Sequence, residues 1–410
     1  MSDIVAFSQV ADIIRGVTFD KAESRMTPAP DYFPILRAGN IQSRLDTDND
    51  LIWIPAARVT PTQRLRIGDI AVAVSSGSSA LVGKSALLLY EWTGSVGAFC
   101  AIVRPKPGVS PSYLASWLRS PAFNQWRVRR TRGANIQNLQ ISELVDAQLP
   151  LPSLDRQVEI ASSISQQMSL ASMADEAVLE QVVLARRLVV AELREHFGAA
   201  VPITNGPSIA QRRSSWTSVA LTGLARLESG HTPSRRHPEW WGGTVPWLAL
   251  PDISKLHGKV AHATTENIND AGLANSSARL LPVGTVCVSR TASIGFVTML
   301  GRPMATSQDF ADWVCDPARL DPEFLMYAFM ASQEHLRELG SGAVHKTIYM
   351  PTIQSFHVTA PSIEEQRRIA RTLRDRLAAA EALATRLRAR QAEIECLPQR
   401  LLAAAFGEAA

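Results

Sequence analysis

The chain of 410 residues contains only four cysteines, and no two of them form a CxxC pair. This scarcity argues against a disulfide framework and against a zinc knuckle. No stretch approaches the ~18 consecutive apolar residues that a membrane helix needs. The N-terminus, MSDIVAFSQV, lacks the basic and apolar regions of a secretory signal. We therefore expect a protein of the reducing cytoplasm that holds no metal.

The sequence also lacks the short motifs that commonly carry catalysis. It has no HExxH zinc motif, no GxSxG nucleophile elbow and no glycine-rich dinucleotide loop. An amino-methyltransferase would use a tetrapeptide such as NPPY or DPPY around its target base, and neither occurs. These absences predict that the chain has no catalytic residue of its own.

Acidic residues are missing from the whole window 92–142, although the formal net charge of the chain is only +4. A local basic field of this kind attracts polyanions. A solvated arginine face explains the window equally well when the window is considered alone. The basic residues of the window are Arg104, Lys106, Arg119, Arg127, Arg129, Arg130 and Arg132.

One sextet occurs twice, as PSLDRQ at residues 152–157 and as PSIEEQ at residues 361–366. The two copies lie 366 − 157 = 209 positions apart, and the same offset relates Gly133 to Gly342. The chain is therefore a tandem repeat of one unit, which is a mixed domain followed by a long segment with helical periodicity. A duplicated unit suggests a duplicated task, such as reading two parts of one extended ligand.

Each domain of the repeat combines strand-like apolar runs with turn-forming residues and short helical patterns, which predicts a mixed α/β fold. In the first copy we expect strands at 70–74, 86–89 and 99–103 and a helix at 111–119. In the second copy we expect a strand at 283–289 and a helix at 322–332.

Apolar residues at spacings of three and four run from Ser153 to Phe197 and again through the segment after Ser362. Such a sustained heptad pattern predicts coiled-coil helices, each about 60 Å long at ~1.5 Å per residue. Ser362 and Glu365 have the spacing of a capping box, which marks the start of the second helix. Two similar helices in one chain most simply pair antiparallel with each other, and pairing between molecules is the alternative.

The segment GSSALVGKS at residues 77–85 resembles a P-loop, but its spacing is wrong. The P-loop has four residues between its first glycine and its Gly-Lys pair, and this segment has five. In the repeat, Gly83 aligns with Gly295 and Lys84 aligns with Phe296, which a duplicated ATP site would not tolerate. We expect a polar loop between two strands, able to face DNA, and no ATP binding.

Polar and basic loops follow the expected strands in both copies. Arginine and lysine contact phosphates, and Asn, Gln and Arg pair with base edges. The loop at 230–241 adds Trp240 and Trp241, of which we expect at least one to be local core. The candidate DNA-binding residues are Ser76, Ser78, Lys84, Arg129, Arg130, Arg132, Asn135, Asn138, His231, Thr232, Arg235, Arg236, Arg290, Ser293, Gln308, His345, Lys346 and Thr347.

The second half contains, in order, LESGHTPSRRHPEWWGGTVPWL, GLANSSARLLPVGTVCVSRTASIGFV, GSGAVHKTI and PSIEEQRRIA. The first half contains RAGNI, LRIGDIAVAVSSG, TRGANIQNL and PSLDRQVEIA. This series resembles the specificity (S) subunit of type I restriction-modification systems over essentially the full chain. One departure is Ser307-Gln308, where the family often has Asn-Gln.

The resemblance implies an α+β fold, with two target-recognition domains separated by two long antiparallel coiled-coil helices. Each domain would read one half of a bipartite site in double-stranded DNA, and the helices would set the spacer between the halves. The implied partners are two methyltransferase (M) subunits and, through them, restriction and translocase (R) subunits. The implied subunit is not catalytic, because S-adenosylmethionine, ATP and Mg²⁺ are used by the partner subunits.

The expected boundaries are 1–150 for the first recognition domain, 151–198 for the central helix, 199–215 for a flexible linker, 216–359 for the second recognition domain and 360–410 for the distal helix. Three alternatives remain: a coiled-coil adaptor for proteins alone, an orphan DNA-binding protein, and a nucleotide-using enzyme. The adaptor would explain the helices but not the basic window, and the enzyme would need the flawed P-loop to be real.

Overall fold

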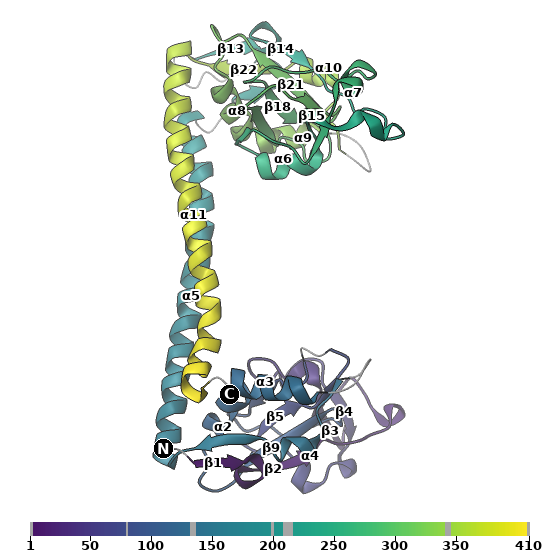
Figure 1. Cartoon of the computed structure of the whole chain (residues 1–410), viewed down its shortest axis with the longest axis vertical. Coiled ribbons are helices and arrows are strands. Elements are labelled where there is room, and N and C mark those ends of the chain that lie inside the picture. The colour runs from purple at the N-terminus through teal and green to yellow at the C-terminus, as the bar shows by residue number, and fades with distance from the viewer. Residues whose placement is uncertain are drawn as a thin grey trace. The chain divides into compact units, whose positions relative to one another are not determined.

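The computed structural model describes residues 3–78, 81–131, 137–197, 201–207, 216–340 and 346–407. These residues form two compact units, each with its own sheets and covering helices (Figure 1). Unit 1 comprises the described residues of Met1–Leu179 and Ala389–Ala410, and unit 2 comprises Glu180–Arg388. Both long helices thus contribute residues to both units, whereas the sequence suggested separate helical segments.

The described part of unit 1 contains a four-stranded antiparallel sheet, three smaller sheets and several short helices. Its elements are β1 (Asp3–Ala6), α1 (Phe7–Val10), β2 (Ala11–Arg15), β3 (Tyr32–Leu36), β4 (Ile52–Pro55), β5 (Ile70–Ala73), β6 (Ser75–Ser76), β7 (Ser85–Leu87), β8 (Ser95–Val96), β9 (Cys100–Pro105), α2 (Pro111–Leu118), α3 (Pro121–Arg130), β10 (Gln137–Asn138), α4 (Ile141–Leu144) and β11 (Gln148–Leu151).

The main sheet of unit 1 has the strand order β2-β9-β5-β7. Its central strand β5 is buried on both faces, which suits a continuous apolar run. Ile70 and Val72 join the cluster that contains α2 and α3, so these helices cover one face of the sheet (Figure 1). Ala71 and Ala73 join a second cluster on the opposite face. The strands and the helix expected from the first-copy sequence are confirmed, with ends shifted by a few residues.

Unit 2 repeats this plan with larger sheets. Its elements are β12 (Ile203–Thr204), β13 (Thr217–Ala220), β14 (Ala225–Glu228), β15 (Trp241–Leu248), α6 (Leu250–Leu256), β16 (Val260–Ala261), β17 (Glu266–Ile268), α7 (Asp270–Ala274), β18 (Val286–Ser289), β19 (Val297–Leu300), β20 (Ala305–Thr306), β21 (Phe310–Cys315), α8 (Pro322–Ala331), α9 (Gln333–Leu339), α10 (Met350–Gln354) and β22 (His357–Ala360). The main sheet has the order β14-β21-β18-β19-β16, and α8 packs against it.

The strand registers of the two units establish which residues correspond. Ile70 of β5 pairs with Val103 of β9, and Val286 of β18 pairs with Trp313 of β21 in the same way. In the hairpin that follows, Gly83 and Gly295 have φ values of 81° and 79°, which glycine adopts without steric cost. Strand β7 starts directly after this turn, so the segment that resembles a P-loop is a hairpin loop and does not open a helix.

The repeated sextet ends in a glutamine that ties each long helix to its domain. Gln157 Oε1 accepts a hydrogen bond from the backbone N–H of Ser110, the N-cap of α2, at 2.9 Å, while Nε2 donates to the carbonyl of Pro152 at 2.8 Å. Gln366 repeats both bonds at 3.0 Å, to Asp321 and Pro361. Both glutamines are buried, so the sextet recurs because the same joint is built twice.

The long helices are α5 (Leu154–Phe197) and α11 (Ile363–Phe406). In unit 2, Arg376 of α11 pairs with Glu192 at 2.7 Å and with Glu195 at 3.2 Å. Leu184 and Leu188, which precede Glu192 in α5, line an apolar groove with Leu387, which follows Arg376 in α11. The two helices therefore run in opposite directions there, and the expected antiparallel pairing is confirmed. Among the described helices, none is both long and apolar enough to span a membrane.

Each unit also receives the end of the other copy's helix. Phe406 of α11 packs on Tyr113 in unit 1, with ring centroids 5.2 Å apart. Phe197 of α5 packs on Phe324 in unit 2 at 5.3 Å. The linker expected at 199–215 is wrong for Ile203–Thr204, because these residues form β12 and pair with β22.

Candidate nucleic-acid interface

In unit 2, several candidate residues converge where strands of the main sheet end. The Thr232 hydroxyl donates to Gln308 Oε1 at 2.6 Å. Arg290, directly after β18, donates from Nε to the backbone carbonyl of Gln308 at 3.0 Å. Three segments that are distant in sequence therefore place an exposed amide, a hydroxyl and a guanidinium together.

The returning segment Lys346–Ile348 completes this cluster. Thr347 forms an isolated β-bridge with Thr291, and the backbone of Ile348 donates to the carbonyl of Arg290 at 2.8 Å. The N–H of Arg290 donates to the carbonyl of Asp309, also at 2.8 Å. The backbone of Arg290 is thus fixed from both sides, and its two terminal nitrogens have no bonded carboxylate among the described residues.

Arg235 has a different role from Arg290. It forms a bidentate pair with Glu266, with both N–O distances 2.6 Å, and its guanidinium lies 3.7 Å from the ring centroid of Trp241. The pair lowers the pKa of Glu266 and raises that of Arg235. Trp241 in turn packs against the cluster around Trp247, which confirms that one of the two tryptophans is local core. The Arg235 fork is already occupied by this pairing.

The remaining unit 2 candidates lie in neighbouring loops. His231 is exposed, and its carbonyl accepts from Trp247 Nε1 at 3.1 Å. Arg236 and Lys346 are exposed, and Ser293 lies in the hairpin turn after β18. Ser307 is buried and its hydroxyl donates to the Asp309 carboxylate at 2.9 Å, so it shapes the loop that presents Gln308. The candidate His345 lies outside the described residues.

Unit 1 has a cavity of about 770 Å³ at the place that corresponds to this cluster. Ser76 lines it, and the strand pair β6–β10 sets Ser75 opposite Asn138. Phe99 occupies the position of Asp309, because its carbonyl accepts from Val74 as that of Asp309 accepts from Arg290. The Phe99 side chain is 63% exposed. The same backbone frame therefore presents an apolar ring in unit 1 and polar groups in unit 2.

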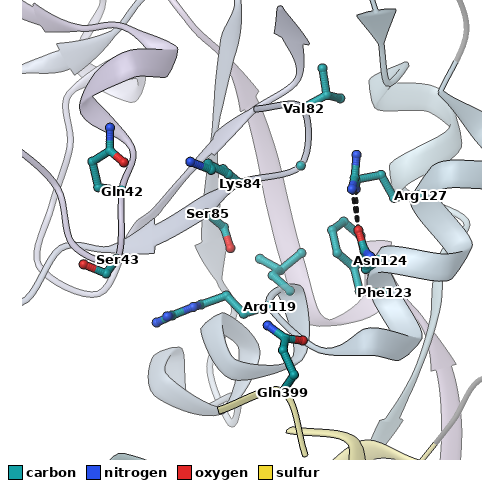
Figure 2. A pocket seen from close by; sticks show the side chains of 12 residues that line it. Gln42, Ser43, Val82, Lys84, Ser85, Arg119, Phe123, Asn124, Arg127 and Gln399 are labelled. Atoms are coloured by element: carbon teal, nitrogen blue, oxygen red, sulfur yellow. Dashed lines mark hydrogen bonds between the residues drawn. The ribbon is translucent and has the colours of Figure 1, made fainter. Parts of the chain in front are cut away.

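The other unit 1 candidates that the structure describes are not among the residues lining this cavity. Lys84 lines a second pocket, shown in Figure 2. Arg129 and Arg130 are exposed at the end of α3, where the Arg130 guanidinium lies 4.9 Å from the Trp126 ring centroid. Ser78 donates its N–H to Ser76 Oγ at 3.1 Å. The candidates Arg132 and Asn135 lie outside the described residues.

Two cations of the acid-free window have structural roles. Arg104 pairs with Asp69 at 2.7 Å, and Lys106 lies 3.6 Å from Asp12. The acidic partners come from outside the window, so a scan of the window alone could not find them. The basic field of unit 1 is correspondingly smaller than the sequence suggested.

Sequence reasoning missed several residues of the unit 1 cavity. Thr18, Arg37 and Phe99 line it. Thr18 corresponds to Thr232 because the residues before them make equivalent bonds. The N–H of Val17 donates to the carbonyl of Val96, the last residue of β8, and the N–H of His231 donates to that of Thr306, the last residue of β20. The internal repeat contained this signal, but the loops differ in length between the copies and only the strand registers align them.

Comparisons with known proteins agree with this geometry. The family model described as "Type I restriction modification DNA specificity domain" matches residues 213–390. The StySPI specificity subunit of Salmonella potsdam, a type I restriction enzyme subunit, is 27% identical over 97% of this chain and 87% of its own length. The chain is therefore similar over nearly its whole length to a specificity subunit of a type I restriction enzyme, and its residues 213–390 match the DNA specificity domain of such systems. The matched model describes a DNA specificity domain, which supports the expectation of a DNA-binding protein with target-recognition domains.

Other relatives support the assignment over smaller or more distant ranges. The EcoKI specificity subunit of Escherichia coli K12 is 34% identical over 39% of this chain and 35% of its own. The HsdS subunit from Thermoanaerobacter tengcongensis shares the fold, with a TM-score of 0.67, 18% identity and coverage of 99% and 97% of the two chains. A chain from a structure of type I R-M system assembly has a TM-score of 0.74 at 18% identity, over 99% and 98%.

Proposed function

We propose that this specificity subunit reads a bipartite site in double-stranded DNA, with one half-site for each unit. It acts as the non-catalytic recognition subunit of a complex that methylates adenine. Two M subunits dock on it, and R subunits join through them. The partner subunits use S-adenosylmethionine, ATP and Mg²⁺, and this chain uses no cofactor. Genomic DNA as the substrate implies a cytoplasmic complex.

The proposal rests on the strand ends of the two units, which have the same backbone arrangement but different side chains. In unit 2 the strand ends present Thr232, Arg290, Gln308 and Thr347. By strand register, the corresponding residues of unit 1 are Thr18, Val74, Ala98 and Asn138. A shared frame with different side chains is what two readers of different sequences require, because base edges are distinguished by donors, acceptors and apolar contacts.

The chemistry of the two sets suggests how each unit reads. Unit 2 offers amide and guanidinium donors, which suit the acceptors of a purine edge in the major groove. Unit 1 offers the exposed ring of Phe99 beside Ser76 and Asn138. An aromatic ring contacts the thymine methyl group by apolar contact. The two half-sites are therefore expected to differ in sequence.

Methylome sequencing with and without the gene tests the proposal. Loss of one bipartite adenine-methylation motif on deletion supports it and names the target. Replacing residues 216–359 with the equivalent domain of another specificity subunit is then expected to change one half of the motif only. A change in both halves contradicts independent reading, and an unchanged methylome on deletion contradicts the proposed function itself.

A further inference from the structure

Unit 1 contains a second pocket, of about 410 Å³, which shares no lining residue with the cavity lined by Ser76 and Phe99. Its volume lies within the ~300–1,000 Å³ range of small-molecule sites. Lys84 and Ser85 line it from the β5–β7 hairpin, Arg119 from the end of α2, Arg127 from α3, and Gln399 from α11. Figure 2 shows Lys84 and Arg119 extending to the same side of the pocket.

The charge of this pocket is one-sided. Three of the described residues that line it are basic, and the described lining contains no Asp or Glu. Arg127 bonds to the Asn124 amide oxygen (Figure 2), a neutral partner. Burial lowers the pKa of the guanidinium groups of Arg119 and Arg127, whereas the Asp69 carboxylate raises the pKa of Arg104 in the same unit. A bound anion would supply a counter-charge for Lys84 and Arg119, neither of which pairs with a carboxylate among the described residues.

The Ser85 hydroxyl is a second, independent sign of a ligand. Ser85 is 3% exposed, and its Oγ has no hydrogen-bond partner among the described residues. A buried hydroxyl without a partner costs free energy, and buried polar groups are normally satisfied. In Figure 2 this hydroxyl points into the space between Lys84 and Arg119. An acceptor oxygen placed there would satisfy it.

At the corresponding place in unit 2, apolar residues stand where unit 1 has Lys84, Ser85 and Arg119. By hairpin register, Lys84 and Ser85 correspond to Phe296 and Val297. By their position relative to the helix N-caps, Arg119 corresponds to Met330. The Phe296 ring packs on His257 at 4.9 Å. The repeated fold thus does not need polar groups here, so their presence in unit 1 calls for another explanation than folding.

We propose that the pocket binds a phosphate group, with Lys84 and Arg119 balancing its charge and Ser85 donating a hydrogen bond to one of its oxygens. The phosphate comes either from the backbone of bound DNA or from a free phosphate compound. A phosphate from the DNA backbone is expected only if the proposed function is correct, whereas binding of a free phosphate compound does not depend on that function.

The test uses the full-length chain and three variants: R119Q, S85A and the control R66Q. Arg66 is an exposed arginine at the opposite end of the β5–β7 hairpin, so R66Q makes the same charge change outside the pocket. The first measurement titrates inorganic phosphate by calorimetry against chloride at equal ionic strength. The second measures the affinity for a DNA duplex at several salt concentrations.

If the phosphate is free, R119Q weakens phosphate binding at least tenfold and S85A weakens it severalfold, while R66Q leaves it unchanged. If the phosphate belongs to DNA, R119Q lowers the slope of log affinity against log salt by about 0.9, and S85A weakens binding without changing the slope. A change in both measurements means that one pocket accepts both sources. Equal behaviour of wild type, R119Q and S85A in both measurements overturns the inference.

Two further controls keep the test decisive. Circular dichroism checks that each variant folds, and K84Q replaces R119Q if that variant does not fold, because Lys84 is an exposed side chain of the same pocket. A wild-type chain that binds no DNA contradicts the proposed function, and the phosphate titration then decides the inference alone.

Discussion

Replacing Arg290 should relax the sequence preference at one position of one half-site. Its backbone is fixed by hydrogen bonds to Asp309 and Ile348, and its Nε donates to Gln308 at 3.0 Å. These contacts restrict the guanidinium while leaving the N–H groups on its two terminal nitrogens for a ligand. Guanine offers two acceptors, O6 and N7, in the geometry that an arginine fork matches. We therefore expect Arg290 to read a guanine.

The magnitude follows from that pairing. A bidentate arginine–guanine contact is worth about 1–3 kcal/mol of discrimination against the wrong base. At 1.4 kcal/mol for each factor of ten, R290A should lower the preference for guanine about 5- to 150-fold at that position. R290K keeps the charge but has no fork, so it should relax the same position.

The assay is methylation-motif sequencing of cells that carry each variant with its partner subunits. Arg302, an exposed arginine between β19 and β20, provides the control R302A, which should keep the motif. The other half-site should stay intact in all variants. If R290A and R290K instead reduce methylation equally at every site with the motif unchanged, Arg290 contacts phosphate and the reasoning about guanine is wrong.

Three further predictions concern the joints, the core and the helices. Q366A removes the bonds to Asp321 and Pro361 and leaves buried groups unpaired, so it should lower the free energy of unfolding by about 2 kcal/mol, measured in urea; an unchanged value would show that the glutamine joint is dispensable. Burial raises the pKa of Asp312 to about 7 from 3.8, so the folded state keeps a proton that the unfolded state releases, and the free energy of unfolding should fall as pH rises from about 4 to 7 and then level off. D312N should flatten this dependence between about pH 4 and pH 7, and an equally steep dependence in the variant would assign it to other groups. One heptad added to both α5 and α11 lengthens each helix by about 10 Å, so if the helices set the spacer, the methylated motif should gain roughly three base pairs between its halves; methylation of the original spacing at full efficiency would exclude that role.

The long helices and the duplicated plan were predictable because their causes are local or periodic. Heptad spacing sets the face of α5 and α11 that is buried, and the sextets recur because Gln157 and Gln366 make the same bonds. The capping prediction is confirmed in its first half, since Ser362 Oγ accepts from the Glu365 N–H at 3.4 Å. The hairpin at Gly83 was also predictable, because the repeat showed that lysine is not required there.

The partners of individual cations were not predictable, because they come from distant segments. Arg235 and Arg290 are both loop arginines of unit 2, but Glu266, 31 residues away, pairs with the first and not with the second. Arg104 and Arg119 lie in the same acid-free window, but Asp69 pairs with Arg104, while Arg119 lines a pocket without acids. Composition gives the number of charges in a segment, whereas only the fold determines which of them are neutralised.

Comparison of the two units separates the residues that build the fold from those that read a ligand. Positions with the same role in both units fix the backbone, such as Gln157 with Gln366 and Gly83 with Gly295. Positions at the strand ends and in the basic pocket differ in chemistry, as Lys84 differs from Phe296. A residue that differs between the units without disturbing the fold can determine specificity, because changing it does not destabilise the domain. Differences between the copies are therefore the best guide to the residues that distinguish one half of the target from the other.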